Sequence, residues 1–183
     1  MRKVVITFGL ICGLITAALV WLVTGWLCDG NVIDLDYAMF IGYAAMLIAL
    51  TMVFFGIKSY RDNYGGGQIT FLKGLQIGLL ISLIGGVLYW AGATSYSLTH
   101  PGFEERCTEK FTEHTTNKLR ASGAPQSEID QALADTASMM AMLKNPLIFF
   151  FVCLMEFLPV GIIVTLISAA LLRRRELLPA TAG

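Results

Sequence analysis

The sequence predicts an all-α integral membrane protein, in which a four-helix bundle carries an extra-membrane helical hairpin between helices three and four. Hydrophobic residues make up 56% of the 183 residues and charged residues only 14%, whereas soluble domains carry about 25% charged residues. The charges are also segregated, because long stretches contain none. The net charge is zero, so only the distribution of charge along the chain is informative.

Four apolar runs are each long enough to cross the hydrocarbon core of a bilayer, which takes about 20 helical residues. Backbone N–H and C=O groups in lipid must be satisfied within their own segment, so each run is expected to be a helix. We expect a single membrane domain over residues 1–183. The spans are residues 4–27, 37–57, 74–93 and 147–172.

The charge distribution predicts that both termini face the cytoplasm, because short loops rich in Lys and Arg remain on that side. The loop at 29–36 has three aspartates and no cation. Trp21, Trp26, Tyr89 and Trp90 fall at the outer helix ends, as in an interfacial aromatic belt. The inner basic anchors are Lys58, Arg61, Lys73, Arg173, Arg174 and Arg175.

Small residues recur every four positions on three of the expected helices. Lipid provides no hydrophobic force between helices, so contact depends on close backbone approach over small side chains. These positions are therefore interpreted as packing seams, either inside the bundle or between protomers. They are Gly9, Gly13 and Ala17; Gly74, Gly78 and Ser82; and Gly161, Thr165 and Ala169.

The outer loop, residues 94–146, is long enough to have structure of its own. Apolar residues recur at i+4 from Phe103 to Leu119 and again from Ile129 to Leu143, which is typical of amphipathic helices. A break at 122–125 contains Pro125, a residue that suits a helix start. We expect an antiparallel helical hairpin that caps the bundle or lies on the outer leaflet, as a structural cap or a partner-binding element.

No Ser-His-Asp, paired-carboxylate or HExxH pattern is present, so nothing in the sequence supports an enzyme, and no catalytic residue, metal or cofactor is expected. Cys28 and Cys107 both fall on the outer side and could form a disulfide. A spacing of seven residues could place His100, Cys107 and His114 on one helical face as metal ligands. Only three ligands are offered, and Pro101 makes a helix at His100 doubtful, so a metal site is not expected there.

Glu156 is the residue that most needs an explanation. It lies nine residues into the fourth expected span, so it sits roughly 13 Å deep at 1.5 Å per residue, where carboxylates usually face the bundle interior or water. Pro159 cannot donate to the carbonyl of Met155, which frees an acceptor nearby. Tyr43 lies at a comparable depth and is the expected hydrogen-bond donor. Glu156, Pro159 and Tyr43 form either a protonated structural clamp or a site for an ion, proton or ligand.

Several long segments resemble the signature of a bacterial membrane family. They read FFGIKSYRDNY at 54–64, GGQITF at 66–71, NP at 145–146, EFLPVG at 156–161 and RR at 173–174. The family is the domain-of-unknown-function family numbered 4199, and the resemblance covers nearly the whole chain. It implies four spans and a location in a Gram-negative inner membrane, and it implies no activity, substrate, cofactor or catalytic residue.

The leading functional interpretation is a non-enzymatic structural or accessory component of the membrane. The first alternative is a small transporter or channel component that uses Glu156 and the helix break at Pro159. The second is a sensor that reads the outside through residues 94–146. The expected partners are the lipid bilayer and either a second copy of the chain or another membrane protein, and no nucleic acid is expected.

Overall fold

The computed structural model describes residues 1–26 and 35–173, and within these residues the chain is helical, with turns and no strand. This confirms the all-α prediction. Four of the helices are long and apolar enough to cross a membrane: α1, the part of α2 from Phe40, α3 and α6. The helices are α1 (Arg2–Thr24), α2 (Leu35–Tyr64), α3 (Phe71–Thr99), α4 (Phe103–Ala121), α5 (Gln126–Leu143) and α6 (Pro146–Arg173).

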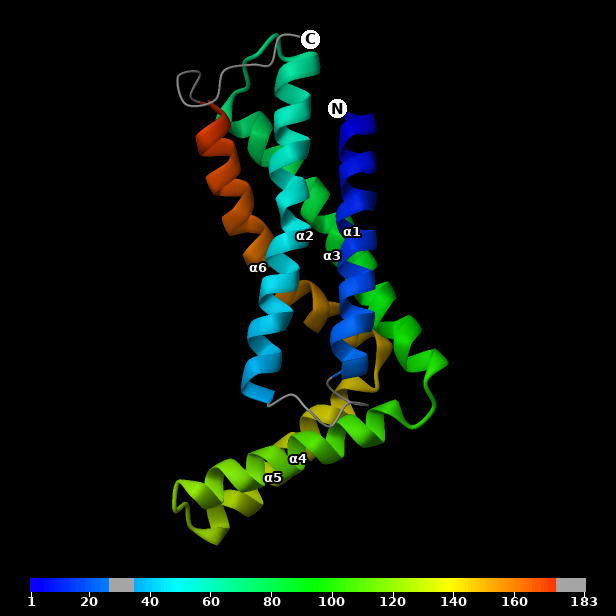
Figure 1. Ribbon diagram of the computed structural model, residues 1–183, viewed down its shortest axis with the longest axis vertical. Coiled ribbons are helices and arrows are strands. Elements are labelled where there is room, and N and C mark those ends of the chain that lie inside the picture. Colours follow the sequence, from blue (N-terminus) through cyan, green and yellow to red (C-terminus); the bar gives the residue numbers. More distant parts are fainter. Residues whose placement is uncertain (27–34, 174–183) are drawn as a thin grey trace.

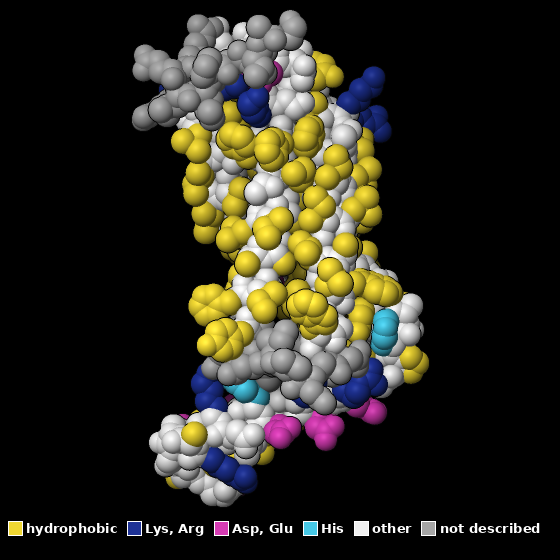
Figure 2. Space-filling view, in the orientation of Figure 1, with side chains coloured by type: hydrophobic (Ala, Val, Ile, Leu, Met, Phe, Trp, Pro, Cys, Tyr) yellow, Lys and Arg dark blue, Asp and Glu magenta, His cyan; other side chains and the backbone are white. Residues whose placement is uncertain are grey.

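The four long helices form a column, and α4 and α5 lie across one end of it as a hairpin (Figure 1). The start of α1, the α2–α3 turn and the end of α6 lie together at the opposite end. Apolar side chains cover the visible middle of the column, whereas Lys and Arg gather near its ends and Asp and Glu along the hairpin (Figure 2). This arrangement is the one expected of a bundle whose middle faces lipid.

Helix α3 is the centre of the bundle, because its most extensive contacts are with α1 on one side and α6 on the other. Small residues allow both contacts. A Cβ atom at Gly9 would lie 2.9 Å from the Ile84 Cβ, and one at Gly13 would overlap the side chain of Leu88. Further along α3, a Cβ at Gly92 would lie 2.8 Å from that of Ala17.

The seam between α3 and α6 joins two of the predicted small-residue stripes to each other. Gly74 faces Ala169, Gly78 faces Thr165, and Gly161 faces Ser82. All six of these residues are buried within the single chain. Of the two alternatives left open by the sequence, the structure therefore places these stripes inside the bundle. The residues are Gly74, Gly78, Ser82, Gly161, Thr165 and Ala169.

The turn between α2 and α3 needs its glycines. A Cβ at Gly65 would overlap the carbonyl oxygen of Gln68. The φ values of Gly66 and Gly67 are 58° and 80°, in a left-handed region that residues other than glycine rarely adopt. Thr70 then caps α3 by accepting a hydrogen bond from the backbone of Lys73 at 3.3 Å.

Arg61, predicted as a basic anchor at the membrane surface, is instead 1% exposed. Its Nε donates to Asp62 Oδ1 at 2.7 Å, and Lys58 Nζ lies 3.0 Å from the other oxygen of the same carboxylate. The backbone carbonyl of Arg61 also accepts from the N–H groups of Gly65 and Gly67. Arg61 thus stabilises the end of α2 and the turn from inside the protein. A pattern of charges along a sequence does not reveal such burial.

The predicted outer hairpin is confirmed as two helices. Helix α4 ends at Ala121, Gly123 has a φ of 75° in the turn, and Pro125 precedes α5. Two of the helices are longer than the spans predicted from the sequence. Helix α2 continues past residue 57 to Tyr64, and α3 continues past residue 93 to Thr99. As a result α3 projects beyond its apolar run toward the hairpin.

An aromatic cluster joins the hairpin to the bundle. The ring of Tyr96 stacks on His100 at a centroid distance of 4.0 Å and meets Trp21 and Phe103 edge-on at 5.3 and 5.0 Å. Trp21 Nε1 also donates to the carbonyl of Gly92 at 3.1 Å. This cluster fixes the junction between α3 and α4 against the end of α1.

We predict that Gly78→Ala destabilises the protein by about 1–3 kcal/mol, the typical cost of overpacking a tight contact. The added methyl group would overlap Thr165 across the α3–α6 seam. Gly42→Ala is the matched control, because a Cβ at Gly42 has no atom within 4 Å. Thermal unfolding in detergent measures the difference. Equal melting temperatures for the two variants would contradict the seam.

Candidate functional site

A largely apolar cavity of about 600 Å³ lies between the halves of the four long helices that are nearer the hairpin. Its walls are contributed by all six helices, and its size falls in the range of about 300–1,000 Å³ found for small-molecule sites. Representative lining residues are Val20 on α1, Met46 on α2, Ala93 on α3, Phe111 on α4, Leu143 on α5 and Phe149 on α6.

Glu156 is the one ionisable carboxyl that lines the cavity from within an apolar run. Its side chain is exposed to the cavity, and Tyr89 Oη donates to its Oε2 at 2.9 Å. The second oxygen, Oε1, has no hydrogen-bond partner among the residues that the structure describes. The ring of Tyr89 is held in turn by stacking on Phe157 at 5.8 Å. Glu156 is thus a positioned acceptor that has one oxygen without a hydrogen bond in the described part of the chain.

The donor to Glu156 is therefore Tyr89 on α3 and not Tyr43 on α2, which was the expected donor. Both tyrosines line the cavity, but Tyr89 lies on the helix that packs most closely against α6 through small residues. Pro159 lies inside α6, one turn beyond Glu156, and the helix continues to Arg173. The three predicted residues are thus brought to one region, and the hydrogen bond is made by a fourth.

The cavity ends where the tightly packed half of the bundle, away from the hairpin, begins. Phe157, next to Glu156, is fully buried and belongs to the core cluster that also holds Leu50, Val53 and Ile81. A Cβ at Gly85 would lie 3.2 Å from the Phe157 ring, so no space separates α3 from α6 at this level. The half of the bundle away from the hairpin therefore forms a packed floor next to Glu156.

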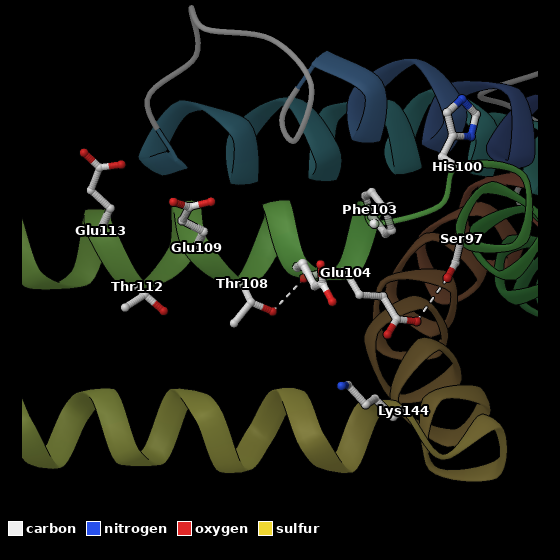
Figure 3. A pocket seen from close by; sticks show the side chains of 11 residues that line it. Ser97, His100, Phe103, Glu104, Thr108, Glu109, Thr112, Glu113 and Lys144 are labelled. Atoms are coloured by element: carbon white, nitrogen blue, oxygen red, sulfur yellow. Dashed lines mark hydrogen bonds between the residues drawn. The ribbon is translucent and has the colours of Figure 1, made fainter.

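An acidic groove borders the cavity at the hairpin. It is lined by residues of α4 together with Ser97, His100 and Lys144, and its volume is about 830 Å³. Glu104 belongs to both hollows and accepts a hydrogen bond from Ser97 at 3.1 Å. In Figure 3 Glu104 points toward Ser97, while the side chains of Glu109 and Glu113 lie on the side of α4 away from α5. The groove thus carries several carboxylates, of which Glu104 also lines the cavity.

The candidate cysteine and histidine sites are not assembled as metal ligands. His100 lies at the end of α3, stacked on Tyr96, and no group of His, Cys, Asp and Glu within residues 1–26 and 35–173 could hold a metal ion. Cys12 and Cys153 are free and buried, and Cys107 is disulfide-bonded. Cys28, its predicted partner, lies outside the described residues, as do the anchors Arg174 and Arg175.

A model of the family described as Protein of unknown function (DUF4199) matches residues 7–174. The match covers nearly all of the chain. The protein belongs to the DUF4199 family. No curated protein and no solved structure matches the chain. The resemblance found in the sequence is therefore confirmed.

The family-like segments of this DUF4199 protein have identifiable places in the fold. The segment 54–64 forms the end of α2, with its buried Arg61 and the ion pair of Lys58 with Asp62. The segment 156–161 contains Glu156, which lines the cavity, and Phe157, which closes it below. It also contains Gly161, which packs closely against Ser82. The sequence did not identify Tyr89 as the donor, because its position beside Trp90 at a predicted helix end indicated a residue of the interfacial aromatic belt.

Proposed function

We propose that this DUF4199 protein is a non-enzymatic, multi-pass component of the bacterial inner membrane that binds a small, largely apolar ligand beneath its outer hairpin. The observation that carries the proposal is the cavity of about 600 Å³ with a single positioned carboxyl at its inner end. Ligand sites in proteins are commonly of this kind, with mainly apolar walls and a few placed polar groups.

The chemistry of the lining supports binding over catalysis. Glu156 is paired with a phenol, and the cavity wall also includes the neutral polar side chains of Thr16, Tyr43 and Thr94. The hydroxyl oxygen of Thr94 is buried without a hydrogen-bond partner in the described part of the chain. Such unsatisfied groups point to a bound molecule or water that completes the site.

A second candidate function is that of a small transporter component. The cavity is confined to the outer halves of the helices, whereas the inner half is closed by the α3–α6 seam and the core around Phe157. A site at mid-membrane that is open to one side and closed to the other is the arrangement used in alternating access. Pro159, beside the floor, offers a place where α6 could bend.

The proposed orientation places both termini in the cytoplasm and the hairpin outside. It is supported by the basic residues at the end of the column that holds the α2–α3 turn, and by the acidic hairpin at the other end. Lys and Arg near short loops favour the cytoplasmic side.

We predict that a cysteine at Ser122, in the turn between α4 and α5, reacts with a membrane-impermeant maleimide in intact spheroplasts. Ser122 is exposed. A cysteine at Gln68, which is exposed in the α2–α3 turn, is the matched control and should react only after permeabilisation. Labelling of the parent chain is subtracted from both. The reverse pattern would place the hairpin in the cytoplasm.

We predict that a neutral, apolar aryl diazirine labels the cavity in a saturable way when the protein is in lipid nanodiscs. Irradiation and peptide mass spectrometry should find label at Met46 and Phe149, and an excess of the non-photoreactive analogue should remove it. The control is Ile163, which is 57% exposed on the outside of α6 and should be labelled without competition. Uniform labelling that no competitor reduces would mean that the cavity is ordinary lipid-facing surface.

A further inference from the structure

We infer that the ligand of the cavity is a lipophilic organic cation, an apolar molecule with one positive charge that pairs with Glu156. The inference rests on the proposed function, because it assigns the chemistry of the molecule that the cavity binds. It depends on the charge of the lining, on the unpaired oxygen of Glu156 and on the absence of a basic side chain in the apolar runs.

The ionisable residues that line the cavity carry a net negative charge. They include the carboxyls of Glu156 and Glu104 and the amine of Lys144. Lys144 belongs to the mouth, at the end of α5, and α6 begins only at Pro146. Ten residues of α6 separate Pro146 from Glu156, which is about 15 Å along the helix axis. Lys144 therefore cannot serve as the counter-charge of Glu156.

The apolar runs supply no cation of their own, because residues 4–27, 37–57, 74–93 and 147–172 contain neither Lys nor Arg. A carboxylate surrounded by apolar groups and protein dipoles interacts with an opposite charge far more strongly than it would in water. The Tyr89 hydroxyl satisfies only Oε2. A ligand cation placed at Oε1 would complete the pairing that the protein leaves open.

The walls define the rest of the molecule. Beyond Glu156 the cavity is bordered by Met46, Ala93 and Phe149, so the body of the ligand must be apolar to avoid losing hydrogen bonds to water. Tyr43 and Tyr89 contribute aromatic rings to the same wall, and aromatic faces attract organic cations. A neutral acyl chain would fill the apolar part but offer no positive charge to the Oε1 atom of Glu156, since Tyr89 donates only to Oε2.

The groove beside the cavity is negatively charged, as the cavity lining is. The groove beside the hairpin is lined by Glu104, Glu105, Glu109 and Glu113, against Lys144 as its basic residue. Clefts lined by one sign of charge raise the local concentration of ions of opposite sign. The groove meets the cavity at Glu104, Phe103 and Thr108, which line both. A cation approaching along the hairpin is thus directed to the cavity mouth.

The test compares two probes of the same shape and opposite charge. The full-length protein is reconstituted in nanodiscs of phosphatidylcholine, and the binding of tetraphenylphosphonium and of tetraphenylborate is measured, with empty nanodiscs subtracted. We expect saturable binding of the cation alone. Glu156→Gln should weaken it on the order of tenfold or more, as expected for loss of a charge pair in apolar surroundings. Glu128→Gln, which removes an exposed carboxylate in the first turn of α5 that lines neither the groove nor the cavity, should leave the affinity unchanged.

Equal saturable binding of the anion, or an unchanged affinity in Glu156→Gln, would overturn the inference. If Glu156→Gln does not fold, the preference of the wild-type protein for one probe over the other still decides the matter. Failure of the inference is also separable from failure of the proposed function. Competable labelling by the neutral diazirine without cation binding would overturn the inference alone, whereas loss of both would overturn both.

Discussion

The close approach of α3 to α6 over small side chains is the constraint on which the arrangement of the bundle depends. Lipid offers no hydrophobic driving force between helices, so the two backbones are held by van der Waals contact, which requires Gly, Ser, Ala or Thr at each crossing point. In the half of the bundle away from the hairpin, these residues face one another from Gly74 and Ala169 to Ser82 and Gly161. Helix α1 is seated on the opposite side of α3 at Gly9 and Gly13, so α3 is tightly packed on both sides in this half of the bundle.

The cavity follows from the point at which this pattern stops. Beyond Gly86 the contact between α3 and α6 is made by large side chains, including an edge-on contact of Trp90 with Phe150 at 5.3 Å and the stacking of Tyr89 on Phe157. Large rings hold helix axes further apart than glycine does. The helices therefore separate toward the hairpin, and Glu156 lies at the level where the tight seam gives way to the wider part of the bundle.

Much of the fold could be predicted from the sequence because the physics of lipid leaves few choices. Apolar runs of sufficient length must be helices, and the i+4 stripes around Phe111 and Leu133 required an amphipathic pair. The helix ends were less predictable, because capping at Thr70 and the ion pairs beside Arg61 extend α2 and α3 past their apolar runs. A hydropathy profile detects neither the helix cap nor the ion pairs.

The candidate site was predicted only in part. The depth of Glu156 follows from counting residues along one helix, whereas its partner depends on the rotation of α3 against α6, which is set by Gly78 and Thr165 far along both helices. Tyr89 and Tyr43 have the same chemistry and similar depth, so the sequence could not choose between them. The cavity also could not be foreseen, since it arises from the relative tilt of helices and not from any motif.

The central claim, that Glu156 faces a cavity and not lipid, is tested most directly by spin-label accessibility at two neighbouring positions. Cysteines are introduced one at a time at 155 and 156 in a chain whose four native cysteines, Cys12, Cys28, Cys107 and Cys153, are replaced by Ala. Each is labelled with a nitroxide, and its collision rates with oxygen and with a water-soluble nickel chelate are compared. Met155 is 77% exposed on the outside of α6, and the next residue points about 100° away around the helix. The account predicts high oxygen and low nickel accessibility at 155, with a clear gain in nickel accessibility at 156. The same lipid-like profile at both positions would contradict it.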